Sequence, residues 1–285
     1  MPPALTMRAM TRPELDTLLD WAAAEGWNPG LNDAQIFWDT DPEGFIAAEH
    51  EGELIGGGSI VAYGGRFGFM GFFIVRPDHR SQGLGRQLWQ ARRDRLIARL
   101  QAPAVIGMDG VFAMQAFYAR GGFVLSHRDL RFAGLGAPAP PDARLVALTE
   151  VPFAELARYD AAHVPAPRDA FLRAWIAQPG CRALGALQDA VLQGYGVIRP
   201  CRKGFKIGPL FAADAETAEA LYLGLSDHAR GVPLFLDVPE NNPAALVLAA
   251  RHGLREVFGC ARMYYGPPPR LPDHEIFGVT TFELG

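Results

Sequence analysis

The chain has 285 residues, enough for one large domain or for two of ordinary size, each able to bury its own core. Hydrophobic residues make up 49% and charged residues 20%, and the formal net charge of −4 lacks the basic excess that nucleic-acid-binding proteins usually carry. No apolar run reaches membrane-spanning length, and the first residues do not resemble a secretory signal. We therefore expect a cytoplasmic protein without a nucleic-acid or membrane partner.

The first 133 residues show the periodicities of alternating strands and helices. We expect a strand at 6–10, helices at 13–25 and 33–38, strands at 45–49, 53–63 and 69–75, a helix at 84–100, a strand at 105–108, a helix at 112–120 and a strand at 123–132. Residues 69–75 are apolar almost throughout, which is typical of a central strand buried on both faces. The helix at 84–100 has Leu88 and Leu96 on its inner face, and we expect its many arginines to point outward.

Residues 134–142 are rich in glycine, alanine and proline, a composition typical of a linker. Beyond them we expect helices at 153–161, 168–176, 215–230 and 243–251, and strands at 181–187, 190–198, 205–211, 234–238 and 254–265. The order of helices and strands is similar in the two halves, although the residues are not. This repeat predicts two copies of one fold, at 1–133 and 143–285, joined by the linker.

The cysteines and histidines give no sign of a metal site. Cys181, Cys201 and Cys260 lie far apart, and no two histidines have the i, i+4 spacing of a zinc motif. We expect reduced thiols and no metal ion.

The segment from the strand at 69–75 into the helix at 84–100 is the most informative. Gly83 and Gly85 open this helix, where unpaired backbone N–H groups and the helix dipole attract an anion. A diphosphate suits such a site, and Arg80 and Arg86 can add charge-assisted contacts. The segment does not fit a dinucleotide fingerprint, because Leu88 stands in place of the third glycine, and the Walker A pattern is absent.

The segment resembles motif A of the GCN5-related N-acetyltransferases, V-x-P-x-x-R-x-x-G-x-G, which Val75, Pro77, Arg80, Gly83 and Gly85 fill. The resemblance implies a mixed α/β fold: two tandem acyl-CoA N-acyltransferase-like domains, each with a mostly antiparallel sheet flanked by helices. It implies acetyl-CoA as the cofactor. The implied contacts are the backbone of Phe73, Ile74 and Val75 and the loop residues Arg80, Ser81, Gln82, Gly83, Leu84, Gly85 and Arg86.

A second stretch, 117–123, resembles the family's motif B. The resemblance makes Tyr118 the acid that protonates the departing thiolate, a role that a neutral phenol suits, although Tyr118 can equally pack against the sheet. The asparagine that many relatives carry before this helix is missing. Residues 69–74 also lack the glutamate that many relatives use as general base. Asp109 is the first candidate for the base, although an aspartate before a glycine can equally be an ordinary turn residue. A water chain to bulk solvent is the alternative to a protein base.

The stretch Gly26-Trp27-Asn28-Pro29-Gly30 is shared with a tandem two-domain subgroup of this family. The resemblance places it at the acceptor pocket, with Trp27 and Asn28 as a wall and Asp33 neutralising an amine cation. A helix cap followed by a turn explains the glycines and the proline equally well, but it does not explain the tryptophan.

The second half lacks the glycine loop, so we expect a degenerate copy that completes the acceptor pocket or the fold. Glu240, Asn242 and Arg262 are candidates for a shared cleft. The whole pattern predicts an N-acetyltransferase in which a primary amine, on a small molecule or on a peptide or protein lysine, attacks acetyl-CoA directly in a ternary complex. A non-catalytic acyl-CoA sensor and a purely structural glycine turn are the alternatives. The oligomeric state stays open.

Overall fold

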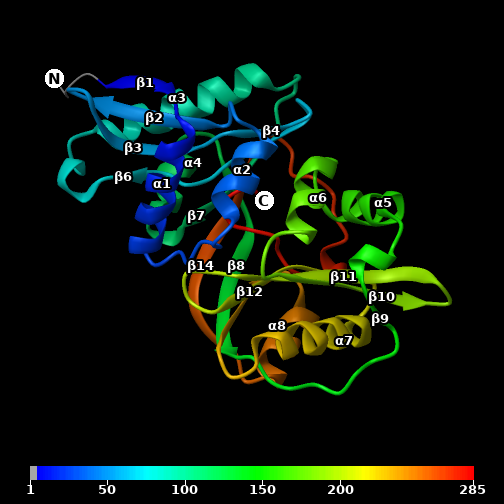
Figure 1. The fold of residues 1–285 in the computed structure, drawn as a ribbon. Helices are drawn as coiled ribbons and strands as arrows, with labels where there is room; N and C mark the ends of the chain where they lie inside the picture. Colours follow the sequence, from blue (N-terminus) through cyan, green and yellow to red (C-terminus); the bar gives the residue numbers. More distant parts are fainter. Residues whose placement is uncertain (1–4) are drawn as a thin grey trace.

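Two β-sheets, one of four strands and one of eleven, organise the computed structural model, which describes residues 5–285 (Figure 1). The strands are β1 (Thr6–Ala9), β2 (Phe45–His50), β3 (Glu53–Ser59), β4 (Val61–Tyr63), β5 (Phe67–Met70), β6 (Ile74–Val75), β7 (Ile106–Val111), β8 (Val124–Leu135), β9 (Leu145–Ala147), β10 (Arg182–Gln188), β11 (Val191–Pro200), β12 (Phe205–Ala212), β13 (Pro233–Pro239), β14 (Arg255–Tyr265) and β15 (Ile276–Gly278). The helices are α1 (Arg12–Ala24), α2 (Asp33–Thr40), α3 (Leu84–Arg99), α4 (Gln115–Ala119), α5 (Phe153–His163), α6 (Asp169–Ile176), α7 (Ala215–Ser226) and α8 (Pro243–Arg251).

The small sheet has the order β1-β2-β3-β6 and is antiparallel throughout. Side chains of β2 alternate between its two faces, as the pleat of a strand requires. Phe45 and Ala47 pack into the core that contains the buried leucines of α1, whereas Ile46 and Ala48 pack into the core that contains those of α3. The two helices therefore cover opposite faces of this sheet.

The large sheet is continuous across both halves of the chain. Its order is β4-β5-β7-β14-β8-β13-β12-β11-β10-β9, and β15 pairs with β12. The last long strand of each half is exchanged: β14 pairs with β7 of the first half, and β8 pairs with β13 of the second half. The two exchanged strands pair with each other in the middle, where Figure 1 shows them side by side in green and orange.

Helices of the second half cover both faces of their part of the sheet. Tyr195 and Val197 of β11 belong to the core that also contains residues of α5 and α6, while Ile198 faces the core of α7 and α8. The core on the α5 side continues into the first half, where the rings of Phe37 and Trp175 stack 6.3 Å apart. The two halves thus bury one common set of apolar side chains as well as sharing a sheet.

Four expected elements differ from the structure. The helix expected at 112–120 begins with a 3-10 turn, Phe112–Met114, and α4 covers Gln115–Ala119. The strand expected at 69–75 is split: β5 pairs with β7, β6 pairs with β3, and Phe72 between them has a φ of +51°. The strand expected at 53–63 is interrupted at Ile60, where β3 ends and β4 crosses into the other sheet. The helix expected at 215–230 ends at Ser226, followed by a 3-10 turn, and the short strands β9 and β15 were not expected.

Candidate active site

A cavity of about 410 Å³ lies where the strand at 67–75 splits. Because β5 stays with β7 while β6 joins β3, the two sheets diverge at Gly71, Phe72 and Phe73. A volume of this size is within the range of small-molecule and cofactor sites in proteins. The lining residues come from both halves of the chain: Glu25, Trp27, Met70, Gly71, Phe72, Phe73, Ile74, Val75, Arg80, Ser81, Gly85, Trp89, Arg92, Met108, Asp109, Val111, Met114, Tyr118, Phe258, Cys260, Phe282 and Glu283.

The expected glycine loop borders this cavity. Gly83 precedes α3 with a φ of +81°, a left-handed conformation that glycine adopts without strain, and no side chain of residues 5–285 caps the helix start. Gly85 has no such requirement, since a Cβ added there meets only the tip of Phe73 at 3.6 Å and Val75 at 3.9 Å. Packing within the protein therefore does not explain Gly85, and its missing side chain leaves the first helical turn open to a ligand.

Some of the predicted cofactor residues line the cavity, and others lie outside its lining. Phe73, Ile74, Val75, Arg80, Ser81 and Gly85 line the cavity. Arg80 donates from Nε to the carbonyl of Val75 over 2.7 Å and forms an ion pair with Glu25. The remaining four lie outside the cavity lining: Gln82, Gly83, buried Leu84 and exposed Arg86.

Tyr118 of α4 lies on the cavity wall, opposite the sheet residue Gly110. A Cβ at Gly110 would come within 2.4 Å of the Tyr118 ring, so the missing side chain makes room for the ring against β7. The rings of Phe117 and Trp89 surround it. Burial raises the pKa of Tyr118 above its ordinary value, which keeps the phenol protonated and able to donate.

Asp109 of β7 lines the cavity, but both of its oxygens are engaged. They accept from Nε and Nη2 of Arg262 at 2.6 and 2.7 Å, and the same guanidinium lies 3.3 Å from the buried carboxylate of Asp129. Burial raises the pKa of Asp109, Arg262 lowers it, and the neighbouring Asp129 raises it further. Arg262 is thus the one member of the suggested shared-cleft set that contacts a cavity residue. Glu240 pairs with Arg128, and Asn242 caps α8.

Of the three residues predicted at the acceptor pocket, one lines the cavity and two do not. Trp27 lines the cavity, and its carbonyl accepts from Arg131 over 2.6 Å. Asn28 lies outside it, and its side chain both donates to and accepts from the backbone of Lys203. Asp33 is also outside it and fully buried.

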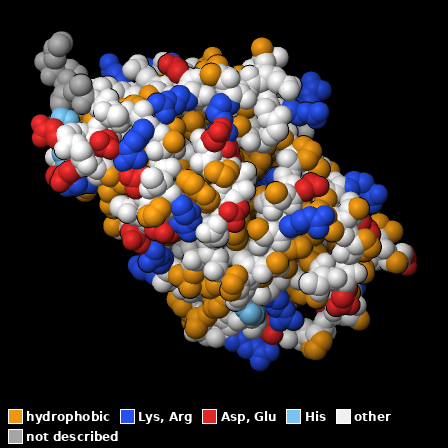
Figure 2. Space-filling model, turned by 45° about the horizontal axis from the view of Figure 1, so that its top comes forward, with side chains coloured by type: hydrophobic (Ala, Val, Ile, Leu, Met, Phe, Trp, Pro, Cys, Tyr) orange, Lys and Arg blue, Asp and Glu red, His pale blue; other side chains and the backbone are white. Residues whose placement is uncertain are grey.

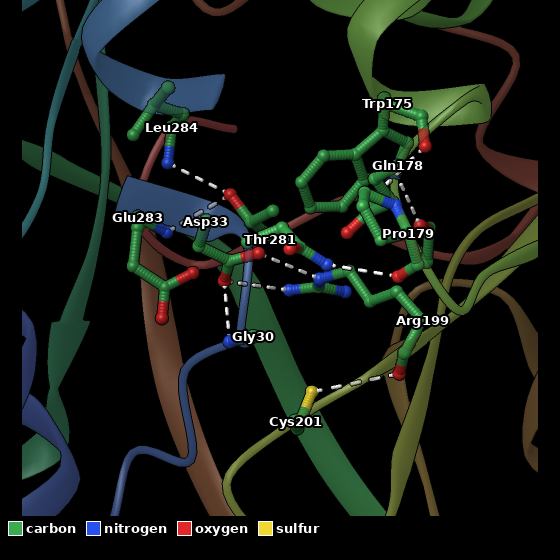
Figure 3. Close-up of polar contacts among 12 residues, drawn as sticks. Gly30, Asp33, Trp175, Gln178, Pro179, Arg199, Cys201, Thr281, Glu283 and Leu284 are labelled. Atoms are coloured by element: carbon green, nitrogen blue, oxygen red, sulfur yellow. Dashed lines mark hydrogen bonds and ion pairs between the residues drawn. The ribbon is translucent and has the colours of Figure 1, made fainter. Parts of the chain in front are cut away.

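Figure 3 shows why Asp33 does not face the cavity. Its oxygens accept from the N–H of Gly30 over 2.7 Å and from Arg199 over 3.0 and 3.3 Å. Asp33 and Arg199 are 166 positions apart, so nothing local in the sequence indicates that this carboxylate is already neutralised inside the protein.

Two buried charged residues of the cavity were not predicted from the sequence. Arg92 faces inward, donates to the carbonyls of Ser59 and Gly71, and has an Nε without a partner among residues 5–285. Burial lowers the pKa of Arg92 to about 10. The sequence contains a signal for the inward orientation of Arg92. The buried stripe of α3 repeats every four residues, at Leu84, Leu88, Arg92 and Leu96.

The second missed residue, Glu283, comes from the last segment of the sequence, and no local pattern marks it. Its side chain is buried and lines the cavity. Within the described part of the chain, no group of three or more metal-ligating side chains occurs, and no helix is long and apolar enough to cross a bilayer. On the face drawn in Figure 2, acidic and basic side chains are interspersed.

Comparison with known proteins gives matches in both halves. A family model described as "Acetyltransferase (GNAT) family" matches residues 12–123, and one described as "Acetyltransferase (GNAT) domain" matches residues 156–278. The holothin acyltransferase of Pseudoalteromonas sp. (strain SANK 73390) is 26% identical over 284 residues, covering 98% of this chain and 94% of the relative.

Two solved structures share the fold. A putative acetyltransferase from Pyrococcus horikoshii superimposes with a TM-score of 0.84 at 20% identity, covering 99% of this chain and 96% of its own. A tandem GNAT protein from the clavulanic acid biosynthesis pathway gives a TM-score of 0.62 at 17% identity, covering 93% of this chain and 100% of its own.

Proposed function

Because the chain belongs to the GNAT superfamily of acyltransferases and carries two such domains in tandem, we propose that it transfers an acetyl group from acetyl-CoA to a primary amine. Acyl transfer is the activity that the family supports; the acetyl donor, the amine acceptor and direct attack in a ternary complex are the proposal. The observation that carries it is the meeting, around one cavity, of the open helix turn at Gly85, the split strand at Phe72 and the buried phenol of Tyr118.

The residues around the cavity fit a coenzyme A donor. The first turn of α3 offers backbone N–H groups to a diphosphate, and Ser81 and Arg80 stand beside it at the cavity mouth. The donor supplies an acyl group activated as a thioester. Arg92 adds a buried positive charge on the cavity wall, which favours negative charge developing nearby.

The split strand supplies backbone donors and acceptors. The N–H of Arg76 donates to Ile55 of β3, and Ile74 pairs with Gly57 on the same strand. Since successive backbone groups of a strand point to opposite sides, the N–H and C=O groups of Phe73 and Val75 are turned away from β3. The carbonyl of Val75 already accepts from Arg80, so we assign the N–H and C=O of Phe73 and the N–H of Val75 to hold the donor's amide arm and acyl oxygen. The backbone of Ile74 is engaged with β3 and is left out of this assignment.

We assign the donor site to residues 1–133, the linker to 134–142 and the completion of the acceptor wall to 143–285. Phe258, Cys260, Phe282 and Glu283 of the second half line the same cavity as the donor residues. A concave cavity of about 410 Å³ with several aromatic side chains in its lining favours the amine of a small molecule over a lysine of a folded protein.

The test is mass spectrometry of a library of primary amines incubated with the protein and acetyl-CoA. We expect one or more members to gain an acetyl group at a rate well above the protein-free blank. The curated relative is named an acyltransferase, without its acyl group, so propionyl-CoA and longer acyl donors belong in parallel incubations. Tight binding of CoA without any acylated product would instead establish the non-catalytic sensor.

A further inference from the structure

The segment 279–285 enters the first half of the molecule beside the split strand. Thr281 Oγ1 accepts from the N–H groups of Glu283 and Leu284 at 3.3 and 2.9 Å, as Figure 3 shows. Ser59 donates to the carbonyl of Glu283 over 3.2 Å, and Tyr63 donates to that of Leu284 over 2.8 Å. These four bonds fix the backbone on both sides of Glu283.

Gly71 makes this approach possible. A Cβ at Gly71 would lie 2.1 Å from the carbonyl oxygen of Glu283, which is far inside van der Waals contact. Gly71 directly follows β5, the half of the split strand that pairs with β7, so the segment 279–285 meets the wall of the cavity at the point where the sheets diverge. Glu283 therefore lines the cavity, although it is far in the sequence from the residues of the split strand.

The carboxylate of Glu283 has a free oxygen. The residue is 3% exposed, its side chain lines the cavity, and Oε2 has no hydrogen-bond partner among residues 5–285. The other two candidate carboxylates are engaged, Asp33 by Arg199 and Asp109 by Arg262. A buried polar atom without a partner is costly unless a ligand supplies one. Among the cavity-lining residues, Glu283 is the one carboxylate with a buried oxygen that no group of residues 5–285 pairs, so it is the carboxylate that a cation entering the cavity would neutralise.

The charges around Glu283 suit a proton acceptor. Burial is the main effect that raises its pKa, and the nearby Asp33 raises it further, while Lys206, Arg131 and Arg199 lower it. Arg199 is already paired with Asp33, and Arg131 is paired with Asp237 of β13, so neither forms an ion pair with Glu283. The net result is a carboxylate that holds a proton more readily than an exposed glutamate does.

We propose that Glu283 binds the ammonium group of the acceptor and takes its proton, so that the second half of the chain supplies the base for the site in the first half. The inference rests on the proposed amine acylation. One proton moves from the ammonium nitrogen to the carboxylate of Glu283. The freed lone pair forms the C–N bond as the C–S bond breaks, the sulfur takes a proton from Tyr118, and the new amide nitrogen loses its second proton to restore Tyr118.

The side chains that line the cavity beside Glu283 indicate the chemical class of the acceptor. Trp27, Phe258 and Phe282 line the cavity together with Glu283, and Arg131 organises them. Its guanidinium lies 5.6 Å from the ring centre of Phe258 and 4.9 Å from that of Phe282, and it donates to the carbonyl of Trp27. Aromatic rings around one anionic oxygen fit a primary amine on a planar or aromatic body.

Calorimetry separates the ammonium contact from transfer. Phenethylamine and phenethyl alcohol differ only in the ionisable group, so each is titrated into wild type, Glu283→Gln and the exposed control Glu256→Gln. We expect wild type and Glu256→Gln to prefer the amine by at least about tenfold, which corresponds to ~1.4 kcal/mol, and Glu283→Gln to lose this preference. A wild type without preference for the amine, whether both probes bind or neither does, would overturn the inference.

The transfer assay uses the best acceptor from the amine library. We expect Glu283→Gln to lower kcat on the order of 10²-fold with unchanged CoA affinity. Its deficit should shrink as the pH approaches the amine's own pKa, about 10 for an alkylamine, because a neutral amine needs no base. Wild type should lose activity as the pH falls through the raised pKa of Glu283. A variant with wild-type kcat and pH profile, or loss of activity only in Asp109→Asn, refutes the role of Glu283 while leaving amine acylation intact. If wild type acylates no amine, it is the proposed function that fails.

Discussion

Replacing Gly85 by glutamate tests the donor site without disturbing the fold. A Cβ at this position makes only ordinary contacts, 3.6 Å to Phe73 and 3.9 Å to Val75, and the residue has no left-handed φ. Glycine inside a helix is less favourable than alanine by roughly 0.5–1 kcal/mol. A carboxylate in the first turn also interacts favourably with the helix dipole. We therefore expect the thermal midpoint of Gly85→Glu to equal or exceed that of wild type.

The same change should weaken CoA binding strongly, because it places a negative charge where we assign the diphosphate. Two unit charges about 5 Å apart repel by roughly 3 kcal/mol at an effective dielectric constant of ~20. Part of this is screened at physiological salt. We expect an affinity for CoA that is on the order of 10²-fold lower, since each factor of ten corresponds to about 1.4 kcal/mol.

Gly85→Gln is the matched control, because glutamine has the size of glutamate without its charge. Isothermal titration with CoA at low and high salt compares the two variants. We expect Gly85→Glu to bind more weakly than Gly85→Gln and the gap to narrow as salt is added. Equal affinities for the two variants at low salt would show that no diphosphate approaches this helix turn, and the assignment of the donor site would fall.

Further changes test other contacts. Tyr118→Phe should lower kcat by about 10²-fold while CoA affinity stays the same, measured by initial rates and calorimetry; a wild-type rate would remove the phenol from the chemistry. Gly71→Ala should force the segment 279–285 away and lower stability by about 1–3 kcal/mol in urea unfolding, together with the loss of transfer; an unchanged midpoint would contradict the 2.1 Å approach to Glu283. Asp33→Asn leaves Arg199 buried without a counter-charge and should cost about 3–5 kcal/mol in the same unfolding assay. At a temperature where Asp33→Asn is folded, its KM for the amine should match that of wild type. A raised KM would indicate that Asp33 contacts the acceptor.

Local features of the site were predictable from the sequence, because their physics is local. The helix that begins at Leu84, its left-handed Gly83 and the strand before it follow from residue type and spacing alone. Arg92 was predictable in principle, since it continues the four-residue repeat of buried leucines in α3. We expected it to point outward because buried arginines are rare, and the structure shows instead that it bridges the carbonyls of Ser59 and Gly71.

Features that depend on distant partners were not predictable. The apolar run at 69–75 indicates a buried strand, but its split at Phe72 depends on β3 and β7 competing for it. The exchange of β8 and β14 has the same origin: each strand is suited to either half, and tertiary packing selects the partner. Glu283 shows this most clearly, because its place in the cavity depends on bonds to Ser59 and Tyr63, more than 220 positions away.

The most direct test of acyl transfer to an amine is the stoichiometry of the reaction with the best acceptor from the library. Free CoA thiol and acylated amine are measured in the same sample, with and without the amine. We expect one thiol for each amide formed, and negligible thiol release when the amine is left out. Thiol release that does not depend on the amine, or amide formation that fails although CoA binds tightly, would contradict the account.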